Sequence, residues 1–484
     1  MLQPRYCASP WRCVVTARKG FGRNVGTFEV RLSSTATVPR GTSSNITNHA
    51  NATTAKQKLS EHPLSVMPTP MLLRSLFIAT VSSNKFLLLP SLRLLSFFAE
   101  PNRSFLFNVD RNPVLKAILK RTLYNQFCAG ETEKETRTCV QQLKDLGFKG
   151  VILTFAREMV HDTKAKSSSH DISASGPYHE AQTAVAHDSN IEAWRVGTLK
   201  TAGLISEGDI LAIKTTGAGS AVVEAFAKGE LPPQQMLDAL DEIATRCKSR
   251  GIQIIIDAES QRWQDGIART TLELMRKFNT DGKAVVYNTY QAYLKATAAT
   301  IAQHMAEAQK DGFTLGLKLV RGAYILSDER SLIHDTKQDT DDAYNAIAHG
   351  ALRQQFGDFG GPGPNAKPFP SVHLFLASHN RDSVMSAHKL RQQRIEAGLP
   401  TVPVAFGQLH GMSDEVSFSL LAQRDEKQHP PQVFKCSTWG TMGECIGYLL
   451  RRAVENRDAV LRTKDEFLAL RKETWRRIKA PFFG

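Results

Sequence analysis

The 484-residue chain has few cysteines and none in close pairs. Its seven cysteines stand apart without a C-x-x-C pair, which argues against a disulfide framework or a zinc module and favours a reducing compartment. No run of about 18 apolar residues occurs, so a single membrane-spanning helix is not expected. The sequence also lacks a Walker loop, a G-x-S-x-G elbow, an H-E-x-x-H motif and the kinase motifs. Metal catalysis and acyl transfer by a serine nucleophile therefore have no support.

The positive charge is unevenly distributed. The formal net charge is +14, and residues 1–40 hold seven basic residues against the single acid Glu29, a local charge of +6. An arginine-rich and hydroxyl-rich segment with almost no acid is typical of a mitochondrial transit peptide, which we predict over residues 1–40. The remaining charge is spread without a basic run or an RNA-binding motif, so no nucleic-acid partner is expected.

Residues 41–102 are predicted to form a linker followed by an amphipathic helical segment. The stretch 63–100 is apolar but interrupted by Arg74, Lys85 and Pro90, which predicts two short helices. Two placements are open for them: packing on the main domain, or lying on a membrane surface.

From residue 103 onward, eight short apolar runs alternate with helical segments. Continuous apolar runs suit strands that are buried on both faces. A doubly wound sheet would usually begin with a glycine-rich phosphate loop, which is absent. We therefore predict an α/β fold, a (βα)8 barrel over residues 103–475 with an N-terminal helical extension. The predicted strands are 150–155, 210–215, 252–257, 284–290, 315–320, 372–377, 404–408 and 433–436. The predicted helices include 234–249, 267–278, 295–311 and 341–355.

Polar residues close most of the apolar runs. Because the active site of such a barrel lies where the strands end, these residues are expected to meet at one rim. A single buried Lys or Asp at a strand end is most often part of a structural ion pair, whereas a whole ring of polar groups is costly without a ligand. The strand-end residues are Lys214, Asp257, Asn288, Gln291, Arg321, His379 and Gln408, and Lys318 lies within the fifth run.

The segment after the last predicted strand, YLLRRAVEN, contains two adjacent arginines. Arg451 and Arg452 follow Tyr448 by three and four residues and so share its side of a helix. Glu455 lies one turn further on and can hold the guanidinium groups in place. Such a pair can bind a carboxylate through paired hydrogen bonds; the alternative is a solvated basic face.

Six motifs occur in the order found in proline dehydrogenases: IDAES, YNTYQAYLK, LKLVRGAY, ASHN, FGQLHGM and GYLLRRAVEN. The chain resembles a mitochondrial, fungal-type proline dehydrogenase over about residues 103–470. The resemblance implies a distorted (βα)8 barrel that holds FAD non-covalently. It also implies an oxidoreductase that converts L-proline to Δ1-pyrroline-5-carboxylate by hydride transfer from C5 to flavin N5, the first step of proline degradation to glutamate. Electrons would pass to a membrane quinone on the matrix side of the inner mitochondrial membrane, with peripheral membrane contact.

The resemblance further assigns roles by position. The substrate positions, in the order carboxylate, ring and apolar wall, are Arg451, Arg452, Tyr448, Tyr324 and Leu409. The other catalytic positions are Lys214, which closes the site, and Asp257, which orders the groups around it. The cofactor positions are Asn288, Lys318, Arg321, Gly322, Ala323, Thr340, His379 and Glu455, with Lys318 near flavin N5.

One position departs from the family pattern. A tyrosine common in the family stands twelve residues before the helix tyrosine, and here that residue is Cys436, which leaves the choice between proline and hydroxyproline open. The amine proton of the substrate can pass to Asp257 or to solvent. Two other functions stay open: a flavin or Schiff-base barrel in which Lys214 or Lys318 forms an imine, and a catalytically inactive barrel that senses proline.

Overall fold

The computed structural model describes residues 62–100, 104–155, 187–325, 327–423, 430–458 and 460–483, without the side chains of 455–463 and 481–483. The predicted transit peptide at residues 1–40 and the start of the predicted linker lie outside this part of the chain.

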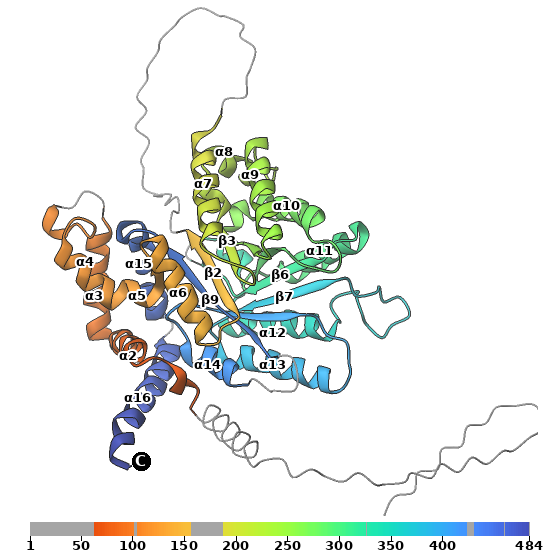
Figure 1. The fold of residues 1–484 in the computed structure, drawn as a ribbon. Coiled ribbons are helices and arrows are strands. Elements are labelled where there is room, and N and C mark those ends of the chain that lie inside the picture. Colours follow the sequence, from red (N-terminus) through yellow and green to blue (C-terminus); the bar gives the residue numbers. More distant parts are fainter. Residues whose placement is uncertain are drawn as a thin grey trace, which may run out of the picture. The chain divides into compact units, whose positions relative to one another are not determined.

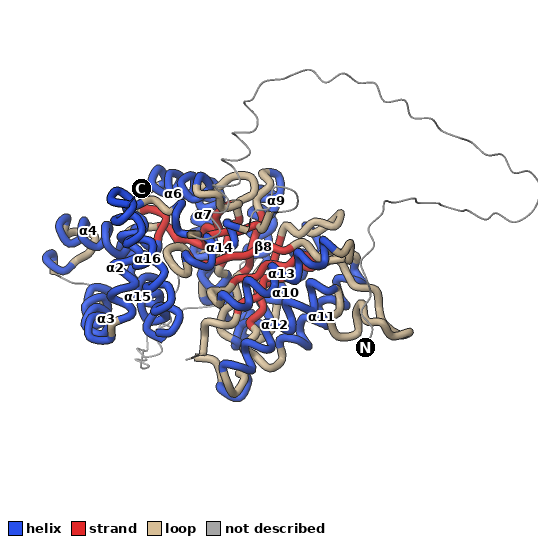
Figure 2. The backbone as a smooth tube through the Cα atoms, turned by 90° about the horizontal axis from the view of Figure 1, so that it is seen from below, coloured by secondary structure: helices blue, strands red, loops and turns tan. Residues whose placement is uncertain are grey.

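Eight parallel strands close into a barrel. Each of them pairs in parallel with the next in the chain, and the last pairs with both its predecessor and the first. The strands are β2 (Gly150–Phe155), β3 (Ile210–Ile213), β4 (Gln253–Ile256), β5 (Val286–Gln291), β6 (Leu315–Val320), β7 (Val372–Ala377), β8 (Val404–Leu409) and β9 (Gln432–Trp439). A short strand, β1 (Cys128–Gly130), adds to the end of β9. The predicted (βα)8 barrel is confirmed, and Figure 2 shows its strands enclosed by helices.

Helices follow the strands and cover the barrel (Figure 1). They are α6 (Glu133–Asp145), α7 (Ser189–Gly203), α8 (Ser220–Ala227), α9 (Gln234–Ser249), α10 (Gln261–Phe278), α11 (Thr297–Asp311), α12 (Lys337–Arg353), α13 (Arg381–Glu396), α14 (Asp414–Ala422), α15 (Met442–Asp458) and α16 (Val460–Phe483). Helix α9 has its predicted bounds, whereas α12 begins four residues before the predicted start at Asp341. A capping box explains this start: the Thr336 hydroxyl accepts from the backbone N–H of Asp339, whose carboxylate accepts from that of Thr336.

Side chains alternate between two cores along each strand. One core lies inside the barrel and includes Tyr287, Phe375 and Phe434, with the Phe375 ring in edge or tilted contact with the other two. The other lies between strands and helices and includes Leu317 and Leu374. Because this alternation is strict, the pairing register decides which strand-end residues face the barrel interior.

Before the barrel, the chain forms a helical extension, as predicted for residues 63–100. Its elements are η1 (Pro63–Val66), α2 (Thr69–Ser83), α3 (Lys85–Ala99), η2 (Phe105–Phe107), α4 (Pro113–Leu119), the π-helical turn η3 (Lys120–Tyr124) and α5 (Asn125–Phe127). Helix α2 packs against α16 and α3 against α15. Within the described residues no single helix has the length and apolar content to cross a membrane; α2 and α3 meet that test only as a pair, bent by 101°.

Candidate active site at the barrel mouth

Two charged residues from different strand segments, Lys318 and Asp257, meet inside the barrel mouth. Lys318 of β6 lies beside Phe375 in the pairing register and so faces the interior. Its Nζ donates to Oδ1 of Asp257, which follows β4, at 2.6 Å. The two side chains are only 11% and 20% exposed, so each neutralises a charge that would be costly alone.

Cys436 of β9 also faces the barrel interior near this ion pair. Burial raises the pKa of its thiol to about 11; nearby Asp257 also raises it, while Lys318, Arg452 and Lys214 act in the opposite direction. The thiol is therefore protonated at neutral pH and is not poised as a nucleophile. The same interactions place four charged side chains, from four different segments, around one inward-facing residue.

Lys214 and Tyr324 approach each other across the mouth. Lys214 follows β3, and its Nζ lies 3.5 Å from the Tyr324 hydroxyl. The turn after Lys214 is fixed by Glu259, which is 5% exposed and accepts hydrogen bonds from the Thr216 backbone N–H at 3.1 Å and from the Thr216 hydroxyl. The loop carrying Tyr324 is fixed by Asp328, whose carboxylate accepts from the backbone N–H of Gln261 at 2.9 Å.

Helix α15 brings the arginine pair to the same region, with two different environments. The Arg452 guanidinium lies 4.9 Å from the centre of the Tyr448 ring, and Arg452 is half-buried with its charge felt by Cys436. Arg451 is exposed. The side chain of Glu455 lies outside the described residues.

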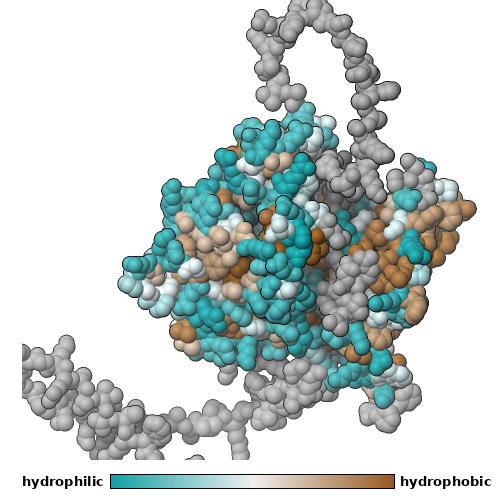
Figure 3. Space-filling model, turned by 180° about the vertical axis from the view of Figure 1, so that it is seen from behind, coloured by the Kyte–Doolittle hydropathy of each residue, from teal (hydrophilic) through white to brown (hydrophobic). Residues whose placement is uncertain are grey.

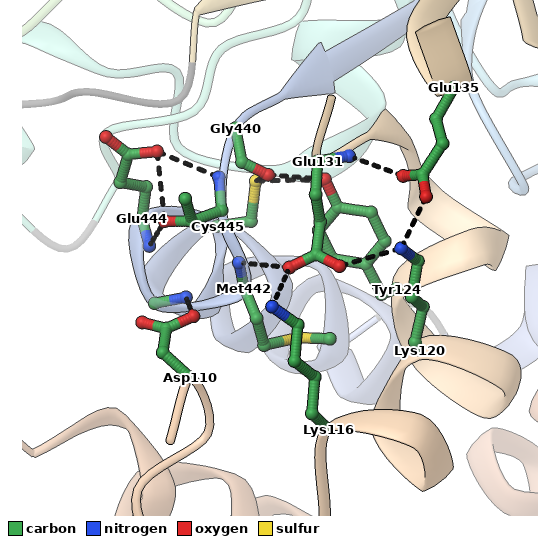
Figure 4. A network of polar contacts seen from close by, with 12 residues as sticks. Asp110, Lys116, Lys120, Tyr124, Glu131, Glu135, Gly440, Met442, Glu444 and Cys445 are labelled. Carbon is green, nitrogen blue, oxygen red and sulfur yellow. Dashed lines mark hydrogen bonds and ion pairs between the residues drawn. The ribbon is translucent and has the colours of Figure 1, made fainter. Parts of the chain in front are cut away.

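A network of carboxylates holds the N-terminus of α15 (Figure 4). Glu131 accepts from the backbone N–H of Met442 at 3.2 Å, and its charge is balanced by Lys116 and Lys120 at 3.0 and 2.8 Å. Asp110 accepts from the backbone N–H of Gly443 at 3.1 Å. Carboxylates at this end of a helix satisfy unpaired N–H groups and favour its dipole, so the network fixes the helix that carries the arginines.

Arg321 organises the rim after β6. Its three guanidinium nitrogens donate to Asp341 at 2.7 Å, Ser378 at 2.6 Å and Ser383 at 2.9 Å. Burial alone would raise the pKa of Asp341, but hydrogen bonds from Lys337 and Arg321 lower it. Arg321 thus joins the ends of β6 and β7 to the start of α12.

The other predicted cofactor residues spread around this rim. Gly322 has φ +145°, and a Cβ there would come within 2.3 Å of the Tyr293 ring, so a larger residue is excluded. The backbone N–H of Ala323 points to Oε1 of Gln291 at 3.4 Å. Thr340 lies in the first turn of α12, next to Asp341.

His379 and Leu409 lie at the ends of β7 and β8. The His379 ring bonds through Nδ1 to the Ser413 hydroxyl at 2.9 Å. Leu409, the last residue of β8, packs on the same apolar cluster as Tyr448, the predicted ring residue.

One predicted cofactor position lies on the outward side of its strand. Asn288 pairs in register with Leu317 and Ile256, both of the outer core, so it faces the helices and not the barrel interior. Gln291, three residues on, faces inward; its Nε2 donates to the Glu259 carbonyl at 3.1 Å. The sequence marked Gln291 as a strand-end residue but gave it no role; counting in twos from Tyr287 would have found it.

The donor set at the mouth fits the FAD that the resemblance implies. A flavin dinucleotide presents an anionic diphosphate and ring carbonyls, which need cationic and N–H donors. Lys318, Arg321 and the Gln291 amide supply such donors at neighbouring strand ends. These residues would hold the cofactor.

Comparison with known proteins agrees with this arrangement. Residues 137–465 match the family model described as proline dehydrogenase. The chain is 30% identical over 430 residues to the mitochondrial proline dehydrogenase 1 of Dictyostelium discoideum, covering 79% of this chain and 70% of that protein. It is also 30% identical over 410 residues to the hydroxyproline dehydrogenase of Mus musculus, covering 75% of this chain and 83% of the other. The proline utilization A structure from Bdellovibrio bacteriovorus shares the fold, with a TM-score of 0.59 at 14% identity; the match covers 86% of this chain and 42% of that one.

Proposed function

Because this chain belongs to the proline dehydrogenase family, we propose that it oxidises L-proline to Δ1-pyrroline-5-carboxylate with FAD as the cofactor. The observation that carries the proposal is the position of Arg452 over the Tyr448 ring, with its charge reaching Cys436 inside the barrel. A cation beside an aromatic face suits an apolar ring that bears a carboxylate.

The protein's contribution is positioning and charge. Arg452 and Arg451 bind the substrate carboxylate, while Tyr448 and Tyr324 pack on the two sides of the ring. Lys214, held by its contact with Tyr324, closes the site. Bound FAD would supply the acceptor for the hydride that leaves the carbon next to the substrate nitrogen. Holding that carbon in one orientation supplies several kcal/mol of the rate enhancement.

The substrate amine must lose its proton for the oxidation to proceed. Asp257 is the carboxylate within the cluster, and its hydrogen bond from Lys318 holds it in one orientation. Solvent is the alternative acceptor. A loss of activity in Asp257→Asn that grows as the pH falls would assign the proton to Asp257.

The electrons leave for a quinone of the inner mitochondrial membrane, and the chain acts on the matrix side. Support comes from the basic, acid-poor composition of residues 1–40 and from the relative in Dictyostelium discoideum, which is named mitochondrial.

Hydroxyproline is the second candidate substrate. Relatives of comparable identity carry the name hydroxyproline dehydrogenase. Cys436 faces the interior with a side chain much smaller than tyrosine, which leaves room for a ring hydroxyl. Cys436→Tyr is therefore expected to reduce turnover of hydroxyproline more than that of proline.

An anaerobic titration of the FAD-loaded protein tests cofactor and substrate together. L-Proline should bleach the flavin absorbance near about 450 nm, and trans-4-hydroxy-L-proline in a parallel titration gives the preference. Imine trapping by borohydride without bleaching would favour a Schiff-base barrel. The absence of both bleaching and trapping would favour a proline sensor.

Arg452→Ala tests the carboxylate assignment. The fall in kcat/KM should correspond to about 3–5 kcal/mol of lost transition-state stabilisation, because the substrate carboxylate loses a charged partner. Arg269→Ala, an exposed arginine on α10, is the matched control and should leave kcat/KM unchanged. Unchanged proline kinetics in Arg452→Ala would overturn the assignment.

A further inference from the structure

The helical extension exposes an unusual amount of apolar surface. Of the 19 large apolar side chains exposed in the described residues, 11 lie between residues 73 and 118. We name the outward side of α3, η2 and α4 the α3–α4 face; it includes Phe86, Leu89, Leu94, Leu106, Val114 and Ile118. Figure 3 shows an apolar area at the edge of the molecule where these helices lie. An exposed patch of this kind marks a binding surface.

Helix α3 carries apolar side chains on its outward side as well as on its inward side. Leu88, Leu92 and Leu95 are buried toward the protein, while Phe86 and Leu94 on the remaining surface are 90% and 55% exposed. The buried side accounts for its packing on α15. The outward side has no such role, because a helix packed on only one side needs only one apolar stripe.

The charge of the extension is strongly positive. Residues 62–124 contain eight Lys and Arg and two acids, Glu100 and Asp110, a net charge of +6. Lys116 and Lys120 are paired with Glu131. The basic side chains that remain exposed on α3, on η3 and before α4 are Lys85, Arg93, Arg111 and Arg121.

From these observations we propose that the α3–α4 face binds the surface of an anionic lipid bilayer. Exposed Phe and Leu side chains enter the boundary between headgroups and acyl chains, and the surrounding cations bind the headgroups. The patch combines a large apolar area with positive charge. A second copy of this chain would bring the same positive charge against itself, which disfavours a self-paired face.

The face also adjoins the helix of the arginine pair. A groove of about 400 Å³ is lined by Leu89, Arg93 and Phe97 of α3 and by Leu450 and Val454 of α15. Binding by the α3–α4 face would therefore bring α15 close to the bilayer. The biological meaning of this binding surface rests on the proposed function. A quinone acceptor would be dissolved in the membrane, so binding there would bring the site close to the acceptor.

Flotation with vesicles tests the proposal without turnover. The FAD-loaded full chain should float with vesicles of phosphatidylcholine and phosphatidylglycerol, and binding should weaken in pure phosphatidylcholine and in high salt. The double variant Phe86→Ser and Leu94→Ser should lower the binding constant at least about tenfold. The matched control, Val196→Ser and Leu399→Ser, removes two apolar side chains that are each 50% exposed elsewhere and should bind like the parent.

Three outcomes would overturn the proposal: no binding by the parent chain, equal loss in both double variants, or a parent dimer that only the α3–α4 variant dissociates. The last would make a second copy the partner of this face. Flavin bleaching by L-proline in vesicle-free solution is measured on the same proteins. A failure of lipid binding is thus distinguished from a failure of the proposed activity.

Discussion

The ion pair between Lys318 and Asp257 couples stability to the site. Lys318→Met leaves Asp257 as a largely buried carboxylate without its partner, so the free energy of unfolding should fall by about 3 kcal/mol. Asp257→Asn should cost a similar amount for the same reason. The double variant should cost clearly less than the sum, because neither charge remains unpaired. Urea unfolding of the four proteins measures the coupling, and additive losses would show that the two groups act independently.

At the residue scale, the sequence predicted which side chains close the strands but not all their directions. Lys214, Asp257 and Lys318 converge as expected, since parallel strands end at one rim. Asn288, a cofactor position implied by the resemblance, lies on the outward side of β5, whereas Gln291, one residue beyond the predicted strand 284–290, faces the interior. The positions of Arg451 and Arg452 relative to solvent required the packing of α15, which no local pattern contains.

At the scale of elements, the start of α15 depends on residues far away in the chain. Glu131→Gln removes the charge that faces Lys116 and Lys120 and weakens the contact with the Met442 backbone N–H. We expect a loss of about 1–2 kcal/mol in the free energy of unfolding and a higher KM for L-proline with a smaller change in kcat, since the arginine helix loses its fixed start.

The matched control for this variant is Glu133→Gln. Glu133 pairs with Lys200 where both side chains are about half exposed, and such pairs contribute little. Equal effects of the two variants on KM would mean that charge near α6, and not the position of α15, controls substrate binding.

The bounds of β9 show why some elements were predicted too short. The predicted strand ended at Cys436, whereas β9 runs from Gln432 to Trp439. The polar residues beyond Cys436 are buried with specific partners: the Ser437 hydroxyl bonds to His410 Nδ1 at 3.1 Å, and the Thr438 hydroxyl donates to the Thr154 carbonyl at 3.3 Å. A hydrophobic pattern cannot identify a strand whose outward side chains are satisfied by distant polar groups.

At the scale of the whole molecule, the last described helix joins the N-terminal extension to the barrel. Arg477 of α16 donates to the backbone carbonyls of Leu64 and Met67 at 3.0 and 2.7 Å. Glu466 of the same helix accepts from the backbone N–H groups of Ser413 and Asp414 at the start of α14, at 2.9 and 2.7 Å. The barrel and the helical extension are therefore expected to unfold together.

These whole-molecule contacts predict opposing effects of pH on stability. Burial lowers the pKa of His410 and of His388 to about 4, so in acid the unfolded chain gains protons that the folded chain does not. Their contribution to stability is lost as the pH falls from 6.5 through 4, on the order of 2 kcal/mol per histidine by pH 5. Burial and nearby Asp414 raise the pKa of Glu466, so its contribution has the opposite sign: it is present at low pH and lost as the pH rises.

Glu466→Gln separates the two effects. Without the glutamate, the loss of stability that the two histidines cause in acid is not offset. The variant should therefore lose more stability than the parent when the pH falls from about 7 to about 5. Asp465→Asn, at the exposed neighbouring position, should follow the parent profile. Urea midpoints across this pH range measure the difference. Parallel profiles for the parent and Glu466→Gln would mean that Glu466 is ionised in the folded chain throughout, and that α16 is held to α14 by a charged carboxylate on the helix start.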